Sequence, residues 1–156
     1  MIKVLFVCLG NICRSPMAEA MFRDLVKREG LEHEILIDSA GTGDWHIGSP
    51  PHKGTKDILT KYEINAEGLL ARQISVQDLQ DFQYIVAMDE SNVQNIKKLI
   101  QRDEDVHIVR LLDYIDDQIG KDVPDPYFTG DFEETYELVK KGCMYLLKDL
   151  RRNHNI

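Results

Sequence analysis

The feature that most constrains the fold is an apolar run near the start of the chain that gives way abruptly to a polar loop. Val4 to Val7 run unbroken, which is typical of a strand buried on both faces. From Met17 onwards apolar residues recur at helical spacing, and Pro16 suits the first turn of a helix. We therefore predict a strand over residues 2–7 and a helix over about residues 16–29, joined by a tight loop.

The loop between this strand and helix has the composition of an anion-binding site. A strand-to-helix loop gathers several backbone N–H groups around one point, at the positive end of the helix dipole. Gly10 and Asn11 are residue types that tolerate the left-handed backbone angles that such a cradle needs. The sequence therefore predicts a cradle for an anion such as phosphate.

Cys8 places a nucleophile in this cradle. A free thiol has a pKa of about 8.5, but a helix N-terminus and a nearby cation lower it and favour the thiolate. Arg14 lies six positions after Cys8 and supplies a guanidinium fork that binds two phosphate oxygens at once. Ser15 can hydrogen-bond the thiolate. The alternative is a buried structural cysteine in a tight loop; the Cys-x5-Arg-Ser spacing between strand and helix favours catalysis.

Cys8 to Ser15, followed by Pro16-Met17-Ala18-Glu19, resembles the signature loop of the low-molecular-weight protein tyrosine phosphatases. The likeness covers nearly the whole chain in family order, with three later segments: Asp38-Ser39-Ala40-Gly41-Thr42, Met88-Asp89-Glu90-Ser91-Asn92 and Val123-Pro124-Asp125-Pro126-Tyr127. The resemblance implies a phosphate-binding loop made of Leu9, Gly10, Asn11, Ile12, Cys13, Arg14 and Ser15. It also implies a supporting polar network that includes Asn11, Ser15 and Ser39.

Strand and helix patterns alternate along the rest of the chain, which implies a parallel sheet covered on both faces. Further strands are expected at Ile35–Ile37, Tyr84–Met88 and His107–Val109, and further helices after Pro51 to Tyr62, around Leu79, over Val93–Ile100 and over about Phe132–Leu150. We expect one α/β domain over residues 1–156, with a three-layer doubly wound fold. Its four-stranded parallel sheet should have the flavodoxin-like order 2-1-3-4, with helices on both faces.

Ligands bind such sheets beyond the C-terminal ends of the strands. Cys8, Ser39 and Asp89 each lie at or just beyond such an end, so these three residues should converge. Asp89 has two interpretations: its carboxylate orients Arg14, or it caps the helix that follows. The two roles are compatible through different carboxylate oxygens.

Asp125 is the second candidate for a catalytic role. Displacing a phenol or alkoxide from phosphorus is slow unless the departing oxygen receives a proton. Pro124 and Pro126 restrict the backbone on either side and can aim this carboxyl group rigidly. The alternative is a turn aspartate, since Asp-Pro is a common turn dipeptide. Tyr127 and Phe128 follow directly and would form an aromatic mouth to the pocket.

Residues 41–51 form a loop rich in glycine and proline that carries Trp45, the only tryptophan. Trp45 either walls the pocket and stacks on an aromatic substrate, or anchors the loop to the surface. His46 beside it is assigned no role. The other histidines, His33, His52, His107 and His154, lack ligand spacing, so we expect neither metal nor cofactor.

The composition excludes several classes of protein. The net charge of −8 argues against general nucleic-acid binding. No apolar stretch approaches the roughly 20 residues that cross a bilayer, and no signal peptide is recognisable. Three cysteines, an odd number, do not suggest a disulfide framework. We expect a cytoplasmic monomer that binds neither nucleic acid nor membrane.

The predicted activity is hydrolysis of protein phosphotyrosine and small aryl phosphates through a phosphocysteine on Cys8. Arg14 and the loop amides hold the phosphate, and Asp125 acts as general acid and then base. Two enzymatic alternatives exist: a protein-arginine phosphatase of the same family, and an arsenate reductase. The reductase needs two further cysteines to relay a disulfide, and residues 70–92 contain none. A phosphate-binding module without activity is disfavoured by retention of Cys, Arg and Asp.

Two further loop residues carry specific hypotheses. Cys13 lies five residues from Cys8 and could form a disulfide with an oxidised Cys8, which protects it from over-oxidation; the alternative is a small residue that fills the loop. Ile12 is expected to face the substrate and favour phosphotyrosine, since family members that prefer phosphoarginine resemble one another in having threonine there. The alternative places Ile12 in the core.

Overall fold

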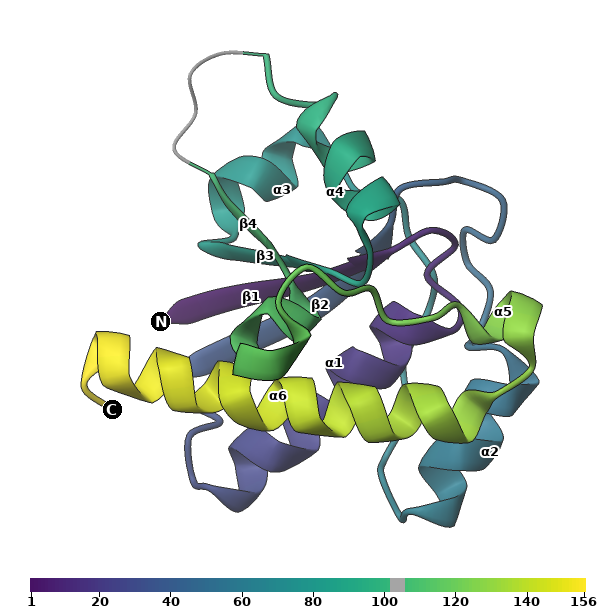
Figure 1. The fold of residues 1–156 in the computed structure, drawn as a ribbon, viewed down its shortest axis with the longest axis horizontal. Coiled ribbons are helices and arrows are strands. Elements are labelled where there is room, and N and C mark those ends of the chain that lie inside the picture. Colours follow the sequence, from purple (N-terminus) through teal and green to yellow (C-terminus); the bar gives the residue numbers. More distant parts are fainter. Residues whose placement is uncertain (102–105) are drawn as a thin grey trace.

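The computed structural model describes residues 1–101 and 106–156. Within these residues four strands form one parallel sheet in the order β2-β1-β3-β4 (Figure 1). The strands are β1 (Ile2–Cys8), β2 (Ile35–Gly41), β3 (Tyr84–Ala87) and β4 (His107–Arg110). The predicted α/β fold and strand order 2-1-3-4 are therefore confirmed.

Six α-helices and two short 3-10 helices connect and cover the strands in the described residues. They are α1 (Arg14–Arg28), α2 (Lys53–Lys61), α3 (Val76–Asp81), α4 (Glu90–Lys97), η1 (Leu111–Tyr114), η2 (Asp116–Gln118), α5 (Pro126–Thr129) and α6 (Phe132–His154). None of the helices in residues 1–101 and 106–156 combines the length and hydrophobicity needed to cross a membrane.

Several boundaries differ from the sequence-based prediction. β2 extends four residues beyond Ile37, because its outward-facing Asp38 is tied to Arg72 while the alternate side chains of the strand are buried. Helix α4 begins at Glu90, three residues before the predicted Val93, since Asp89 and Asn92 form a reciprocal capping box. Helix α5 and the 3-10 helices η1 and η2 were not predicted from the sequence.

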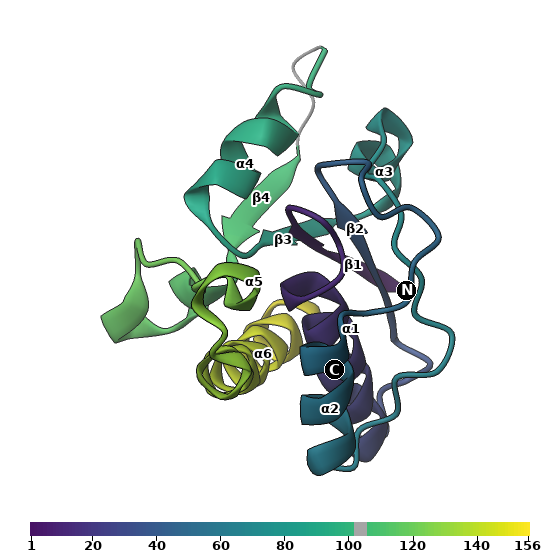
Figure 2. The same cartoon turned by 90° about the vertical axis from the view of Figure 1, so that its right-hand side faces the viewer.

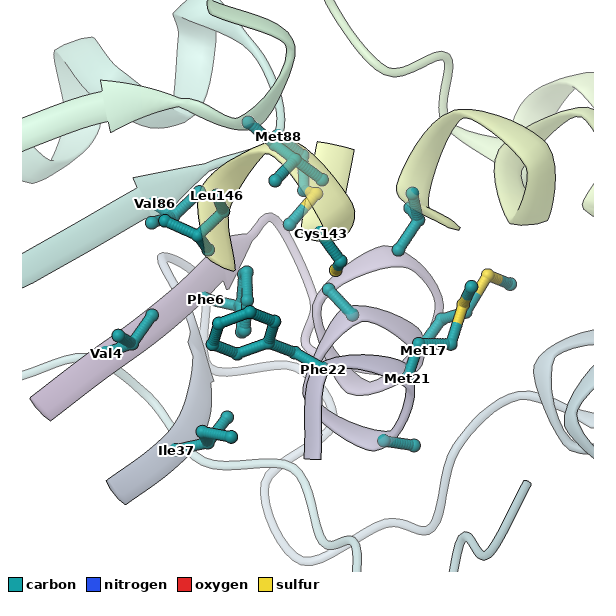
Figure 3. Close-up of a cluster of buried hydrophobic side chains, with 14 of the residues drawn as sticks. Val4, Phe6, Met17, Met21, Phe22, Ile37, Val86, Met88, Cys143 and Leu146 are labelled. Carbon is teal, nitrogen blue, oxygen red and sulfur yellow. The ribbon is translucent and has the colours of Figure 1, made fainter. Parts of the chain in front are cut away.

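The helices form two layers, one on each face of the sheet (Figures 1 and 2). On one face Val4 and Phe6 of β1 pack against α1 and α6 in the cluster drawn in Figure 3. The Phe6 and Phe22 rings meet edge to face with centroids 5.6 Å apart. On the other face Leu5 and Val7 belong to a smaller cluster with residues of α3 and α4. β1 is thus buried on both faces, as its apolar run predicts.

This architecture brings three loops to one edge of the sheet. β1 and β2 end side by side, with Cys8 in register with Gly41, and Val7 is in register with Ala87 at the end of β3. Both termini lie toward the opposite edge, and α5 lies beside the β1–α1 loop (Figure 1). The C-terminal strand ends therefore define where a ligand would bind.

Candidate active site

Neighbouring segments hold the loop from Cys8 to Arg14 through hydrogen bonds to its carbonyl groups. Four of these accept hydrogen bonds from neighbouring segments: Cys8 O from Thr42 N, Leu9 O from Gly43 N, Ile12 O from His52 N, and Cys13 O from the Thr55 hydroxyl. Asn11 adopts the expected left-handed backbone, with a φ of 56°, whereas Gly10 does not have a positive φ and the expectation was wrong there. Helix α1 begins directly at Arg14, so the loop lies against its positive dipole end.

A pocket of about 270 Å³ opens above this loop. Its lining brings together residues from three separate parts of the chain: Cys8, Leu9, Gly10, Ile12, Cys13, Arg14, Trp45, His46, Asp125, Tyr127 and Phe128. The residues predicted to support the loop, Asn11, Ser15, Ser39 and Asp89, do not line the pocket. Ser15 and Asp89 contact the lining residues Cys8 and Arg14, Asn11 lies one hydrogen bond behind Ser15, and Ser39 lies one behind Asn11.

Arg14 is buried at the pocket floor with two acceptors on one nitrogen. Its Nη1 donates to Asp89 Oδ2 at 2.7 Å and to the Val123 carbonyl at 2.9 Å, and its Nη2 donates to Asp125 Oδ2 at 3.3 Å. Nε is buried and has no hydrogen-bond partner among the described residues. Burial acts to lower the pKa of Arg14, but Cys8 and the two carboxylates outweigh it and raise that pKa.

Asp89 makes both of the contacts weighed from the sequence. Its Oδ1 accepts from the Asn92 N–H at 2.7 Å, and Asn92 Oδ1 accepts from the Asp89 N–H in return. Its Oδ2 holds Arg14. Because each oxygen has its own partner, one carboxylate caps α4 and orients the guanidinium at the same time.

Asp125 is likewise both a turn residue and a lining residue of the pocket. Its Oδ1 accepts from the Tyr127 N–H at 3.1 Å and caps α5, with Pro126 in the first turn. Its Oδ2 points to Arg14. The cap therefore fixes the direction of the carboxyl group toward the cradle.

A chain of hydrogen bonds runs behind the loop to Cys8. Cys8 Sγ lies 2.9 Å from Ser15 Oγ, and Asn11 Nδ2 donates to Ser15 Oγ at 2.7 Å and to Ser39 Oγ at 3.0 Å. Ser39 in turn donates to Glu19 Oε1 at 2.6 Å. All of these groups are buried, so the chain is shielded from water.

Glu19 is a residue that sequence reasoning missed, although it belongs to the quoted Pro16–Glu19 motif. It is buried against Ser39, and its second oxygen accepts from Arg23 Nη2 at 2.5 Å. Burial raises the pKa of Glu19, with Ser39 and Arg23 acting in the opposite direction. The available signal was an acidic residue on the apolar face of the predicted helix.

The pocket walls are largely aromatic and exposed. Trp45, Tyr127 and Phe128 have relative exposures of 67%, 56% and 75%. Ile12 lines the pocket and is not a core residue. His46, which was assigned no role, also lines the pocket, with its ring against Gly10.

His52 connects the loop to the aromatic wall and was also missed. The backbone N–H of His52 donates to Ile12 O at 2.7 Å. Its ring Nδ1 accepts from Gly54 N at 3.0 Å and caps α2. The ring stacks on Phe132 at 5.2 Å and meets the edge of Tyr127 at 6.0 Å. This one side chain therefore joins elements that are far apart in the sequence.

Cys13 lines the same pocket as Cys8 and is a free thiol, as are Cys8 and Cys143. Burial, with contributions from Cys8 and Asp125, raises the pKa of Cys13 to about 12. Cys13 therefore stays protonated at neutral pH.

Comparison with known proteins is consistent with this geometry. The family model for low molecular weight phosphotyrosine protein phosphatase matches residues 3–155. The chain is 55% identical to the low molecular weight protein-tyrosine-phosphatase YfkJ of Bacillus subtilis, over 100% of both chains. It is 44% identical to PtpA of Staphylococcus aureus, covering 100% of this chain and 98% of PtpA.

Solved structures agree at the level of the whole chain. The crystal structure of YfkJ from Bacillus subtilis superposes with a TM-score of 0.95 and 56% identity, covering 98% of this chain and 96% of that one. The Drosophila arginine phosphatase DARP superposes with a TM-score of 0.88 and 35% identity, covering 96% and 98%. The chain belongs to the low molecular weight phosphotyrosine protein phosphatase family.

Proposed function

We propose that this protein removes phosphate from tyrosine side chains of phosphoproteins through a phosphocysteine intermediate on Cys8. The observation that carries the proposal is the convergence of Cys8, Arg14 and Asp125 on one pocket, from residues that lie up to 117 positions apart. The three residues supply a nucleophile, an oxyanion clamp and a general acid, which are the functions that phosphate-ester cleavage needs.

Phosphate binding is assigned to the loop amides and to Arg14. Nη1 of Arg14 is already engaged by Asp89 and Val123, Nη2 reaches Asp125 at 3.3 Å, and only Nε has no partner among the described residues. We assign the edge formed by Nε and Nη2 to the ligand, since Nη2 has a second N–H to donate. A phosphate oxyanion would give the buried Nε an acceptor and would receive two parallel hydrogen bonds. This geometry favours a tetrahedral dianion over a neutral ligand.

In the first chemical step Cys8 Sγ attacks phosphorus, and the bond between phosphorus and the tyrosine oxygen breaks. Asp125 donates its proton to that oxygen, so a neutral phenol departs. In the second step Asp125 takes a proton from water as the water attacks the phosphocysteine. The bond between sulfur and phosphorus breaks, and the thiolate is stabilised by Ser15 and by the N-terminus of α1.

The pocket walls support an aryl phosphate as substrate. Trp45 and Tyr127 offer faces and edges for a phenol ring, and Ile12 offers apolar contact. A phosphoarginine guanidinium against Ile12 would leave donors unpaired, at a cost of about 1–3 kcal/mol each. Since DARP, a structural relative, is named an arginine phosphatase, rates on the two substrates have to be compared directly to decide between the two activities.

We further propose that the protein acts as a monomer in a reducing compartment such as the cytoplasm. The nucleophile has to be a thiolate, and all three cysteines are free. Sedimentation analysis tests the monomer, and the fraction of Cys8 recovered as thiol from intact cells tests the compartment.

The experiment that tests the function measures phosphate release from a phosphotyrosine peptide and from the same peptide carrying phosphoarginine. We expect preference for phosphotyrosine of at least about tenfold, equal to about 1.4 kcal/mol. Cys8→Ser should abolish turnover, whereas Cys143→Ser, which makes the same change in α6, should retain it. Turnover by Cys8→Ser, or comparable rates on both peptides, would contradict the proposal.

A further inference from the structure

The side chain of Asn11 is the junction of the hydrogen-bond chain that reaches Cys8. Its Nδ2 donates to Ser15 and to Ser39, and its Oδ1 accepts from the backbone N–H of Arg72 at 2.9 Å. An amide side chain has nearly the same shape after a flip that exchanges its N and O ends. Its orientation is therefore decided by its partners, and a backbone N–H can only donate. The Arg72 N–H thus fixes which end of Asn11 is the acceptor.

This orientation determines where the Ser15 proton goes. Because Asn11 Nδ2 donates to Ser15 Oγ, the Ser15 hydroxyl keeps its own proton for another acceptor. Cys8 Sγ at 2.9 Å is favoured over the Ala40 carbonyl at 3.5 Å, particularly when the sulfur is a thiolate. With the Asn11 amide reversed, Ser15 would donate to Asn11 instead, and Cys8 would lose this donor.

The backbone of Arg72 lies outside the four-stranded sheet and is held by two kinds of contact. Its carbonyl accepts from Gly41 N at 2.8 Å, next to an isolated bridge between Gly41 and Gln73. Its guanidinium makes a two-pronged contact with Asp78, at 2.9 and 3.0 Å, and reaches Asp38 Oδ2 from Nε at 3.2 Å. The side chain therefore clamps its own backbone between β2 and α3.

Both carboxylates in this clamp are themselves fixed. Asp38 Oδ1 accepts from the backbone N–H of Ser39, and the hydroxyl of the same Ser39 accepts a hydrogen bond from Asn11 Nδ2. Asp78 is buried and accepts from Ser75 N at 2.8 Å in the capping box of α3. The clamp thus ties the segment that carries the Arg72 N–H to the strand that carries Ser39.

We propose that Arg72 is a positioning residue for the nucleophile: its side chain holds its own backbone N–H against Asn11, and this directs the Ser15 hydroxyl to Cys8. The inference rests on the proposed function, in which Cys8 reacts as a thiolate. Arg72 touches neither the pocket nor Cys8, so its effect passes through Asn11 and Ser15.

The test follows the rate of Cys8 alkylation by iodoacetate as a function of pH, in Arg72→Gln and in the unchanged protein. Weakening one hydrogen bond to the thiolate should move the midpoint of this profile upward by about half to one pH unit. The kcat for an aryl phosphate should fall about three- to tenfold with KM little changed, because Arg14 and the loop amides are untouched. Arg72→Lys should restore part of the shift.

Two controls separate this effect from general destabilisation. Arg28→Gln removes an ion pair to Asp24 of 3.0 Å on the exposed side of α1 and should leave the midpoint unchanged. In a Ser15→Ala background, Arg72→Gln should add no further shift, since the group that it directs is gone. Asp38→Asn, which weakens one side of the clamp, replaces Arg72→Gln if that variant does not fold, and should give a smaller upward shift.

An unchanged midpoint in a folded Arg72→Gln or Asp38→Asn variant would overturn the proposal. So would a shift that persists in full without the Ser15 hydroxyl. Alkylation is read without any phosphatase substrate. A protein with the expected midpoints but no turnover of aryl phosphates would therefore refute the proposed function and leave this positioning role standing.

Discussion

Replacing Asp125 by asparagine isolates its proposed role as a proton donor. Asparagine keeps a side-chain oxygen that can accept from the Tyr127 N–H, and it caps helices about as well as aspartate. The change removes the carboxyl proton and the contact to Arg14, which at 3.3 Å is the longer of the two ion pairs of that guanidinium. The substitution is therefore expected to alter chemistry much more than structure.

The two effects differ in magnitude. Loss of general acid catalysis should lower kcat for a phosphotyrosine peptide by about 10²–10⁴-fold, or about 2.7–5.5 kcal/mol of transition-state stabilisation. Arg14 keeps Asp89 and Val123 as partners. The loss of folding stability should thus be about 1 kcal/mol or less, which lowers Tm by about 2–4 °C at this chain length.

The assay compares leaving groups. The comparison uses the first step, read as kcat/KM or as the initial burst of phenol release, because the second step is common to all substrates. Phenyl phosphate and phosphotyrosine need a proton on the departing oxygen and should show the full loss, whereas a dinitrophenyl phosphate leaves well unprotonated and should lose about tenfold or less. Asp131→Asn is the matched control, because Asp131 caps α6 through Glu134 N at 2.9 Å and does not line the pocket. Equal losses for all leaving groups, or a similar loss in the control, would refute the assignment of Asp125 as the acid.

Three further predictions address other residues. Peroxide should inactivate the protein reversibly, and Cys13→Ser should recover less activity on addition of thiol; equal recovery measured after matched exposure would exclude a protective disulfide. Ile12→Thr should lower the ratio of the phosphotyrosine rate to the phosphoarginine rate, and an unchanged ratio would show that Ile12 does not determine this preference. Because burial raises the pKa of Glu19 above its ordinary value of 4.5, the folded state holds more protons than the unfolded state just above that pH. The free energy of unfolding should therefore fall as pH rises from about 4.5 through the raised pKa. Denaturant titrations at a series of pH values should show a smaller fall in the free energy of unfolding for Glu19→Gln. The same pH dependence in the variant and the unchanged protein would contradict this prediction.

The fold could be predicted because its signals are local. β1 contains the continuous apolar run Val4 to Val7 with a characteristic loop after it, and parallel strands separated by helices leave few possible topologies. The second half of β2 escaped prediction because Asp38 and Ser39 are polar, and their polarity serves Arg72 and Asn11. Helix α5 escaped because Asp125-Pro126 is also a turn signal, and four residues carry no helical period.

The candidate site could be predicted only in part. Cys8, Arg14 and Asp125 carry chemistry that is recognisable in the residue types. By contrast, Arg72 meets Asn11 across 61 residues through a backbone N–H, which has no signature in the side chain. His52 acts through stacking and capping contacts that arise only when α2, α5 and α6 are assembled. Such residues are found from tertiary contacts rather than from sequence pattern.

The phosphocysteine itself is the most direct test of the mechanism. The Asp125→Asn protein should be mixed with a dinitrophenyl phosphate, quenched rapidly in acid and digested, and its peptides examined by mass spectrometry. In the proposed mechanism Asp125 also activates water for the second step, so the intermediate should accumulate in this variant as phosphate on the peptide that contains Cys8. Cys8→Ser in the same background should give no thiol-bound phosphate. Phosphate bound to another residue, or turnover with none bound to Cys8 at any time, would contradict the proposed mechanism.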